Sequence, residues 1–165
     1  MGDNGEVCVG GAQNINIIPE SIGNLTGLKD ALLIMGRDDY LIQSLPESIG
    51  NLINLERLWV YGTSIEEFPE SIGNLSNLKS INFGENLQLT ALPESIFNLE
   101  NLESLSAEFS SDESWEGLGN FSSLPENIGD FNNLSNLYIY GAELTSLPES
   151  ICNLPDGCEI NFAYN

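Results

Sequence analysis

The sequence predicts an α/β repeat protein, in which short units that each contain a helical segment and a strand stack on each other. A motif of an apolar residue, proline and glutamate recurs six times, at intervals of 27, 23, 24, 32 and 23 residues. Within each unit the apolar residues change from a spacing of three to a spacing of two. A unit of about 23 residues cannot bury its own apolar side, so neighbouring units must stack on each other.

The first part of each unit predicts a short helix. Glu-Ser-Ile follows the proline in five units, and the remaining one reads Pro125-Glu126-Asn127-Ile128. Apolar spacing of three after a proline, with a glutamate favoured by the helix dipole, indicates a short α or 3₁₀ helix with proline in its first turn. The six prolines are Pro19, Pro46, Pro69, Pro93, Pro125 and Pro148.

The second part of each unit predicts a strand, because its apolar residues alternate. Leu58 and Val60 show this spacing in one unit, and Leu137 and Ile139 show it in another. An insertion blurs the first unit, where Leu32 and Ile34 are expected to point inward. A weaker unit before it would place a strand at residues 6–9, with Cys8 in the position of Leu58. Seven strands are therefore expected.

The pattern LPESIGNLxNLxxLxLxxNxLxxLP resembles the leucine-rich repeat family, in its roughly 23-residue intracellular, bacterial and plant-like forms. The resemblance covers residues 18–165 and implies a right-handed solenoid with a concave parallel sheet and short helical or extended convex segments. It implies a single domain over residues 1–165, with a partial capping repeat at 1–17 and units starting near 18, 45, 68, 92, 124 and 147. The family's asparagine after the strand occurs only at Asn86 and Asn165, so we expect no continuous asparagine ladder.

Charge and composition exclude several classes of function. The chain has 4 Lys plus Arg, 25 Asp plus Glu and no histidine, for a net charge of −21. So few cations argue against nucleic acid and anionic membranes as partners. Without histidine the chain cannot build a Ser-His-Asp or Cys-His site. The glutamates after the prolines form a row along the solenoid and do not converge on one site. We therefore expect that the chain is not an enzyme and binds no cofactor or metal.

Strand residues that alternate with the buried ones are the candidate binding residues. Exposed Trp and Tyr side chains on a rigid sheet indicate contact with a partner, since such residues dominate interfaces. Their alternative role is to stack laterally along the strands. The candidates are Leu33, Met35, Arg57, Trp59, Tyr61, Asn82, Glu108, Tyr138, Tyr140, Asn161 and Tyr164.

Two insertions provide a second candidate surface. Extra residues lie at 37–39 and, more prominently, at about 111–119, and both are expected at one edge of the sheet. Trp115 lies between acidic residues there and would serve either as an anchor for a partner or as a cover for a thin repeat. The insertion-loop candidates are Asp112, Glu113, Trp115 and Glu116.

These observations favour a non-catalytic module that binds a protein or peptide with a basic rim. Two alternatives stay open: a surface or secreted protein that binds glycans or self-associates through an uncapped last strand, and the recognition part of a larger bacterial effector. The chain has no signal peptide or membrane segment, which favours the cytoplasm unless a signal was removed. Three cysteines suit reduced, partly buried thiols, although a bridge between Cys152 and Cys158 is also open.

Overall fold

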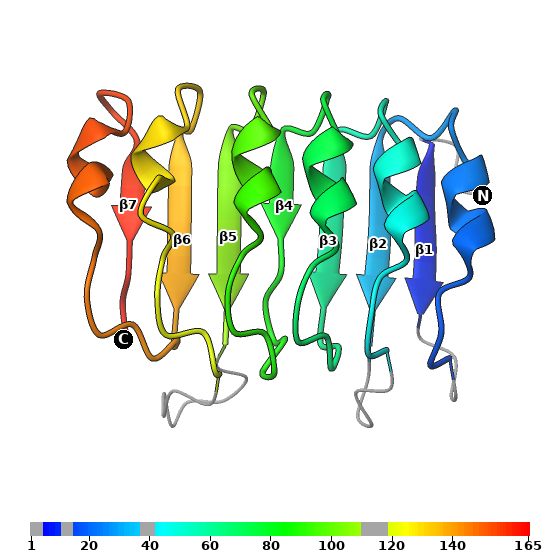
Figure 1. Cartoon of the computed structure of the whole chain (residues 1–165), viewed down its shortest axis with the longest axis horizontal. Coiled ribbons are helices and arrows are strands. Elements are labelled where there is room, and N and C mark those ends of the chain that lie inside the picture. The colour runs from blue at the N-terminus through cyan, green and yellow to red at the C-terminus, as the bar shows by residue number, and fades with distance from the viewer. Residues whose placement is uncertain (1–4, 11–14, 37–41, 110–118) are drawn as a thin grey trace.

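The computed structural model describes residues 5–10, 15–36, 42–109 and 119–165, and it confirms the α/β solenoid. In this part of the chain seven parallel strands form one sheet in chain order, with a short 3₁₀ helix between successive strands (Figure 1). The strands are β1 (Glu6–Gly10), β2 (Ala31–Met35), β3 (Arg57–Tyr61), β4 (Ser80–Asn82), β5 (Ser104–Glu108), β6 (Asn136–Tyr140) and β7 (Glu159–Asn161). The helices are η1 (Glu20–Asn24), η2 (Glu47–Asn51), η3 (Glu70–Asn74), η4 (Glu94–Asn98), η5 (Ile128–Asp130) and η6 (Glu149–Asn153).

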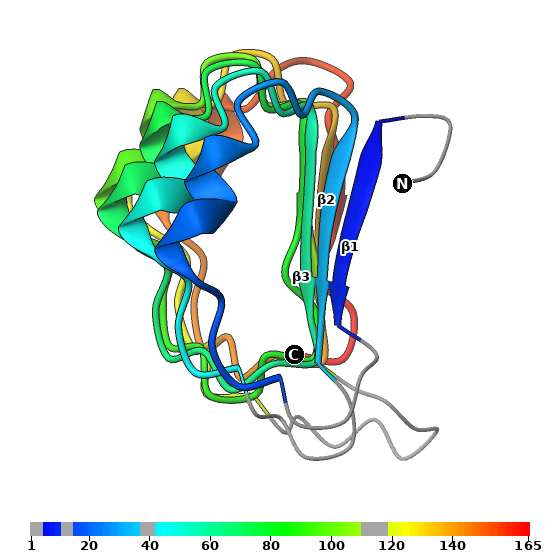
Figure 2. The same ribbon diagram turned by 90° about the vertical axis from the view of Figure 1, so that its right-hand side faces the viewer.

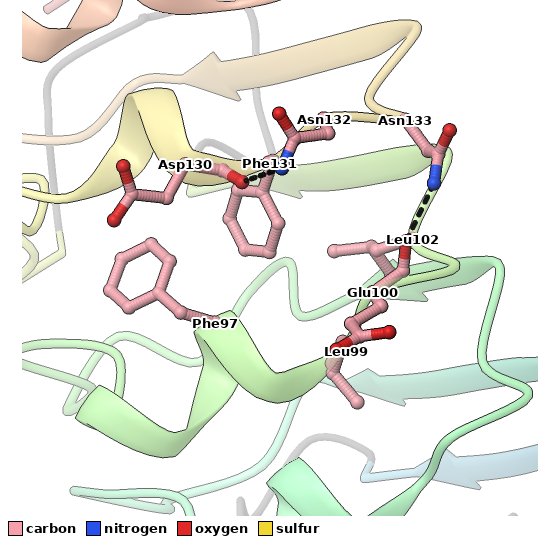
Figure 3. Close-up of a pocket in the computed structure, with 8 residues that line it drawn as sticks. All are labelled: Phe97, Leu99, Glu100, Leu102, Asp130, Phe131, Asn132 and Asn133. Carbon is pink, nitrogen blue, oxygen red and sulfur yellow. Dashed lines mark hydrogen bonds between the residues drawn. The ribbon is translucent and has the colours of Figure 1, made fainter.

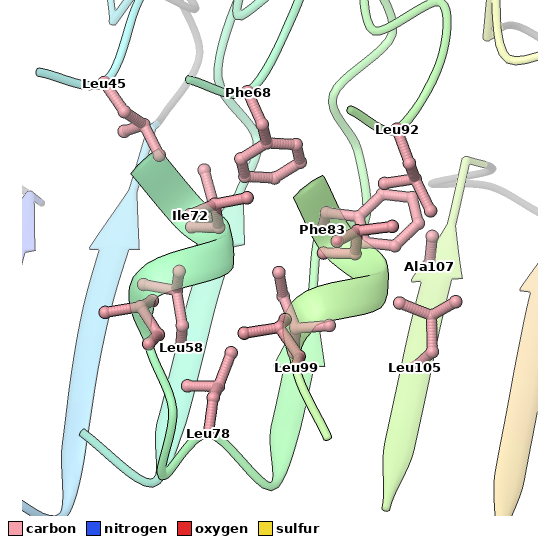
Figure 4. Packing of buried hydrophobic residues seen from close by; sticks show 14 of the residues in the cluster. Leu45, Leu58, Phe68, Ile72, Leu78, Phe83, Leu92, Leu99, Leu105 and Ala107 are labelled. Carbon is pink, nitrogen blue, oxygen red and sulfur yellow. The ribbon is translucent and has the colours of Figure 1, made fainter. Parts of the chain in front are cut away.

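The strands and helices form two layers that enclose one apolar core. Figure 2 shows the helices on one side and the sheet on the other, joined by the turns of each repeat. Leu58 and Leu105 from the strands and Ile72 from η3 are fully buried between the layers (Figure 4). In the described residues the opposite side of the sheet carries no helix, and we call it the sheet face.

Each proline precedes its helix and does not start it, which corrects the predicted helix start by one residue in five units and by three residues at Pro125. Pro46 is extended, with φ −71° and ψ 148°, and η2 begins at Glu47. The ring restricts φ and removes an N–H, so proline fits this last extended position. Its carbonyl oxygen accepts the hydrogen bond from the Ile49 N–H, at 3.0 Å, that closes the first turn.

A ladder of asparagine side chains joins successive repeats at the turn before each strand. Asn54 donates from its amide nitrogen to the carbonyl oxygen of Thr26 at 2.9 Å, and Asn77 donates to Ile53 at 2.8 Å. Asn101 and Asn133 make the same bond to the preceding repeat. These are the second asparagines of the NLxNL motif. The first asparagines of the motif end the helices.

The repeated glutamates have a structural task on the helix side. The carboxylates of Glu20, Glu47 and Glu70 each accept a hydrogen bond from the backbone N–H of the serine in the next helix, at 3.2 to 3.3 Å. A free N–H at a helix start is thus satisfied by the neighbouring repeat. The predicted row of glutamates is therefore partly a set of links between repeats.

The register of β1 differs from the prediction. Cys8 pairs with Leu33, and Val7 pairs with Leu32. Val7 and Val9 therefore pack towards the core, whereas Cys8 is exposed on the sheet face. The segment before Ile18 is one residue longer than its counterpart before Phe68, and in a strand a shift of one residue moves a side chain to the other face.

Aromatic rings fill the core on both sides of the long insertion. Phe109 and Phe121 are fully buried and stack with ring centroids 5.6 Å apart. Both also contact Phe83, at 6.2 and 5.8 Å. These rings close the core of the repeat that carries the insertion.

Candidate functional site

Strand pairing places the candidate binding residues in straight rows across the sheet face. One row runs through equivalent positions of β2 to β7. Its members all point away from the buried residues that flank them in their own strands, as period two requires. From β2 to β7 the row is Leu33, Trp59, Asn82, Ser106, Tyr138 and Asn161.

The first two strands of this row carry a continuous apolar patch. Leu33 pairs with Trp59, and Met35 pairs with Tyr61, so the four side chains lie together on β2 and β3. Trp59 is 42% exposed and Met35 is 38% exposed, whereas Leu33 and Tyr61 are half-buried. We call these four residues the apolar patch. Cys8 adjoins it on β1, beside Leu33.

A pair of tyrosines on β6 forms a second aromatic area. The rings of Tyr138 and Tyr140 lie 6.1 Å apart, and the Tyr138 hydroxyl donates to the side-chain oxygen of Asn136 at 3.2 Å. Hydrogen bonding to Glu159, together with partial desolvation, raises the pKa of Tyr138 to about 12. The hydroxyl is therefore neutral and able to donate at ordinary pH.

The strands between the two aromatic areas carry small polar side chains. Ser80, Asn82, Ser104 and Ser106 are half-buried there. Asn82 accepts a hydrogen bond from the Gly84 N–H at 3.0 Å, so its side-chain oxygen is partly used by its own backbone. This region offers hydroxyl groups and one amide between the apolar patch and the tyrosines.

The Arg57 side chain forms ion pairs with carboxylates of its own chain. Its guanidinium forms ion pairs with Glu6 at 2.9 Å and with Asp30 at 3.3 Å. Both carboxylates and the guanidinium are about 40% exposed, so the network is accessible to solvent. The arrangement ties β1 and β2 to β3, and Arg57 therefore borders the apolar patch as a structural residue.

The remaining sheet-face candidates lie towards the two ends of their strands. Glu108 is exposed and pairs with Tyr140 across β5 and β6. Asn161 is exposed and accepts a hydrogen bond from the Ala163 N–H at 3.0 Å, which repeats the arrangement at Asn82. Tyr164 is 54% exposed just after β7.

The insertion-loop candidates Asp112, Glu113, Trp115 and Glu116 fall outside the described residues, as do residues 37–39. All three cysteines are free, and Cys8 and Cys152 are exposed, contrary to the expectation of partly buried thiols. Among the described residues, no cluster of three or more Cys, Asp or Glu side chains is suited to hold a metal. In the same residues no helix is long and apolar enough to cross a membrane.

One feature that the sequence analysis missed lies on the helix side. Phe97 stands where four other helices have glycine, and a hollow with a volume of about 320 Å³ opens beside it. The irregular PESIF among the PESIG motifs was the signal available in the sequence. Its meaning depended on how closely the helices approach each other, which only the structure provides.

Comparisons with known proteins agree with this architecture. A family profile described as a leucine-rich repeat region matches residues 8–124. A search of the curated proteins found no match.

Solved structures with a similar fold include a chain from the Drosophila Toll–Spatzle complex in its glycosylated form, with 18% identity and a TM-score of 0.63 over 91% of this chain and 19% of that one. The plant peptide hormone receptor RGFR1 in complex with RGF2 gives 25% identity and a TM-score of 0.53 over 89% of this chain and 30% of that one. The leucine-rich repeat domain of the type III effector XopL gives 19% identity and a TM-score of 0.47 over 96% and 75% of the two chains.

This chain thus spans less than a third of the length of the matched Toll–Spatzle chain and of the matched RGFR1 chain. The profile match, in contrast, covers more than half of the 165 residues. With its stacked strand and 3₁₀-helix units, the chain belongs to the leucine-rich repeat family.

Proposed function

We propose that the chain is a non-catalytic interaction module that binds a protein or peptide segment through the sheet face. The observation that carries this proposal is the apolar patch, where Trp59 and Met35 remain about 40% exposed beside Leu33 and Tyr61. Contiguous exposed apolar side chains on a folded protein commonly mark an interaction site. Tryptophan and tyrosine also contribute much of the binding energy at such sites.

The spacing of the two aromatic areas suits an extended segment. Trp59 and Tyr138 share one row and are separated by Asn82 and Ser106. Three strand steps of about 4.8 Å place them about 14 Å apart, and an extended chain covers that span in about four residues. We therefore expect a bound segment with two apolar or aromatic residues about four positions apart.

The polar strands between the anchors match the needs of such a segment. Ser80, Ser104 and Ser106 present hydroxyl groups, which both donate and accept hydrogen bonds with a peptide backbone. The Tyr138 hydroxyl donates to Asn136, and its oxygen can accept a further hydrogen bond. The net charge of −21 favours a partner with a basic rim, because the field of the protein would accelerate its approach.

The family assignment and one comparison support a binding role. The structure at 25% identity is titled as a plant peptide hormone receptor in complex with RGF2. We infer no catalytic role for this chain, since it has no histidine and its repeated glutamates lie in a row. The insertion-loop residues Asp112, Glu113, Trp115 and Glu116 are proposed as an additional contact edge.

The test begins with selection of random displayed peptides against the purified protein. Binding of the selected peptides is then compared for wild type and a variant with Trp59, Tyr61, Tyr138 and Tyr140 changed to alanine. Because each buried aromatic anchor contributes about 2 kcal/mol or more, we expect affinity to fall by about 100-fold or more. The matched control changes Ile17 and Ile53, which are 73% and 50% exposed, to alanine.

The control variant should bind as wild type does, and circular dichroism should show both variants folded. Selected peptides that bind the folded four-residue variant as tightly as wild type would overturn the proposal. A glycan array run on the same proteins addresses the alternative ligand. A glycan signal that depends on Tyr138 and Tyr140, with no peptide selected, would also overturn it.

A second candidate use, self-association at the β7 end, is favoured by the exposure of apolar residues there. Ile160 pairs with the fully buried Leu137 and yet is 42% exposed, and Leu147 is 47% exposed. In the described chain β7 is the last strand of the sheet, so its outer edge offers unpaired backbone groups. Scattering over a range of concentrations would show growth in size for wild type and none for Ile160→Lys. Concentration-independent scattering of the wild type would exclude this use.

A further inference from the structure

Close packing of the helices depends on a glycine in each repeat. A Cβ built on Gly23, Gly50, Gly73 or Gly129 would lie only 2.0 to 2.5 Å from the carbonyl oxygen of a serine in the next helix. Real side chains do not approach backbone atoms so closely, so these positions accept only glycine at the observed helix spacing. Helices η1 to η4 pack on their neighbours in this way, and η5 packs on η6 in the same way.

Phe97 interrupts this packing between η4 and η5. It occupies the glycine position of η4, and its half-buried ring contacts Phe131 of the next repeat, with centroids 5.1 Å apart and planes inclined by 41°. Helices η4 and η5 are not among the closely packed neighbouring helix pairs, unlike the other pairs along the described chain. A side chain therefore acts as a wedge where the other repeats have none.

A hollow of about 320 Å³ lies beside the wedge, on the helix side of the solenoid (Figure 3). Phe97 lines it together with Leu99, Leu102 and Phe131, which are 1 to 3% exposed and belong to the core. Figure 3 shows the two phenyl rings side by side in this hollow. Its volume is at the lower end of the range for ligand sites, about the scale of one long side chain.

The rim of the hollow presents hydrogen-bond acceptors. Asn133 donates its amide to the Glu100 carbonyl oxygen at 2.8 Å, and Asn132 donates to the Asp130 carbonyl oxygen at 2.9 Å. Each bond uses one of the two N–H groups of its amide, and the rim also carries the amide oxygens and the carboxylates of Glu100 and Asp130. Acceptors therefore outnumber the remaining donors, so a ligand for such a rim needs several donors.

No ion pair neutralises these carboxylates in the described part of the chain. There the ion pairs join Lys29, Arg57 and Lys79 to the carboxylates of Glu6, Asp30 and Glu56. A second hollow, of about 270 Å³, is lined by Lys29, Asp30 and Glu56, so its charges are already paired. The hollow at Phe97 differs because it combines an accessible aromatic ring with two carboxylates that have no cationic partner among the described residues.

We propose that the hollow at Phe97 receives an arginine side chain from a protein partner. The guanidinium has five donors and no acceptor, which complements the rim, and its flat face stacks on aromatic rings. The aliphatic stem contacts Phe97, and the guanidinium bonds to one carboxylate of the rim, that of Glu100 or that of Asp130. This site lies on the side opposite the sheet face, so it is independent of the proposed peptide site there.

The test uses nitrogen-15-labelled protein and the capped peptide Gly-Gly-Arg-Gly-Gly, followed by nuclear magnetic resonance. We expect concentration-dependent shifts of the backbone amides of residues 97–102 and 130–133, with smaller changes elsewhere. The same peptide with citrulline has nearly the same shape and no charge, and it should bind at least about 10-fold more weakly, because charge-assisted hydrogen bonds are lost. Equal binding of the two peptides would overturn the proposal.

Two variants locate the site. Glu100→Gln with Asp130→Asn should remove the preference for arginine over citrulline, whereas the matched control Glu94→Gln with Glu126→Gln should retain it. Phe97→Leu keeps an apolar side chain in the wedge position and should weaken arginine binding several-fold through loss of the ring face. Unchanged binding by the folded double variant would overturn the proposal. A free alkylguanidine that binds while the peptide does not would show a small-molecule site and would equally overturn it.

Discussion

Asn86 holds the neighbouring repeat through Thr63: its side-chain oxygen accepts hydrogen bonds from both the N–H, at 3.0 Å, and the hydroxyl of Thr63. Its amide nitrogen donates to the carbonyl oxygens of Val60 and Phe83, at 2.8 and 2.7 Å. Both Asn86 and Thr63 are buried. One side chain thus satisfies polar groups of two repeats at the point where the chain leaves the strands.

We expect Asn86→Ala to lower the free energy of unfolding by about 2 to 4 kcal/mol. The substitution leaves several buried polar groups without partners, and each such group costs about 1 to 3 kcal/mol, partly relieved by relaxation. Chemical denaturation would measure the loss. The control Asn74→Ala removes an exposed asparagine at the end of η3 and should change stability by less than about 0.5 kcal/mol. Equal stabilities of the two variants would contradict the role of Asn86.

The residue before this asparagine position has a left-handed backbone in several repeats. Glu85 has φ 54° before Asn86, and Gly62 has φ 63° before Thr63. We expect Gly62→Ala to cost about 1 kcal/mol and Glu85→Gly to be neutral or slightly stabilising, because only glycine adopts this region without strain. Thermal unfolding of the two variants provides the measurement. A destabilisation by Glu85→Gly larger than that by Gly62→Ala would refute this expectation.

The sheet-face rows could be predicted from sequence because alternation is a strong constraint. Once Leu58 and Val60 are buried, Trp59 must point outward, and equal repeats place Tyr138 in line with it. The same rule explains the error at Cys8. The distance of Cys8 from Pro19 equals that of Leu58 from Pro69, which predicts a buried Cys8. The alternation of Val7 and Val9, however, decides which face of β1 is buried.

Features that depend on contact between repeats were beyond the sequence pattern. The amides of Asn51 and Asn54 are chemically equal in the motif, yet of the two it is Asn54 whose bond to a carbonyl oxygen of the preceding repeat is seen among the described residues. The sequence also shows that Phe97 replaces a glycine, without showing that this glycine touches the next helix. Arg57 looked available for a partner until strand pairing placed Glu6 and Asp30 beside it.

The glycines of the helices provide a sharp test of the packing. Gly73→Ala would place a Cβ 2.3 Å from the carbonyl oxygen of Ser95, so η3 and η4 would have to separate. We expect a loss of about 3 kcal/mol, the upper part of the usual range for overpacking. Gly27→Ala is the control, since its Cβ would meet no atom within 4 Å. If both substitutions had equal effects on the denaturation midpoint, the close approach of the helices would be wrong.

The pKa of Tyr138 can be tested directly. Hydrogen bonding to Glu159 is the main cause that raises it to about 12 from the ordinary 10.0. In an ultraviolet titration we expect one tyrosine to ionise near pH 12, and Glu159→Gln should move that ionisation towards pH 10. Glu143→Gln, an exposed glutamate elsewhere, is the control and should leave the titration unchanged. An unaltered high pKa in Glu159→Gln would exclude Glu159 as its main cause.

The same shift makes stability depend on alkaline pH. The folded state holds its proton up to about pH 12, whereas the unfolded chain releases it near pH 10.0. The contribution of Tyr138 is therefore fully present below pH 10 and is lost as the pH rises towards 12. Denaturation midpoints measured across this window should fall more steeply for wild type than for Tyr138→Phe. Parallel curves would show that Tyr138 does not contribute.

The net charge of −21 predicts that salt stabilises the fold. The repeated glutamates bring like charges side by side along the helix side, and the four described ion pairs offset few of them. Salt at about 0.1 M screens exposed charges beyond about 10 Å, so repulsion in the folded state weakens. Thermal midpoints should therefore rise with sodium chloride, by about 2 to 4 °C for each kcal/mol gained. A variant with Glu94, Glu126 and Glu149 changed to glutamine should respond less to salt. A wild-type midpoint that falls with salt would mean that attractive ion pairs, led by Arg57 with Glu6, outweigh the repulsion.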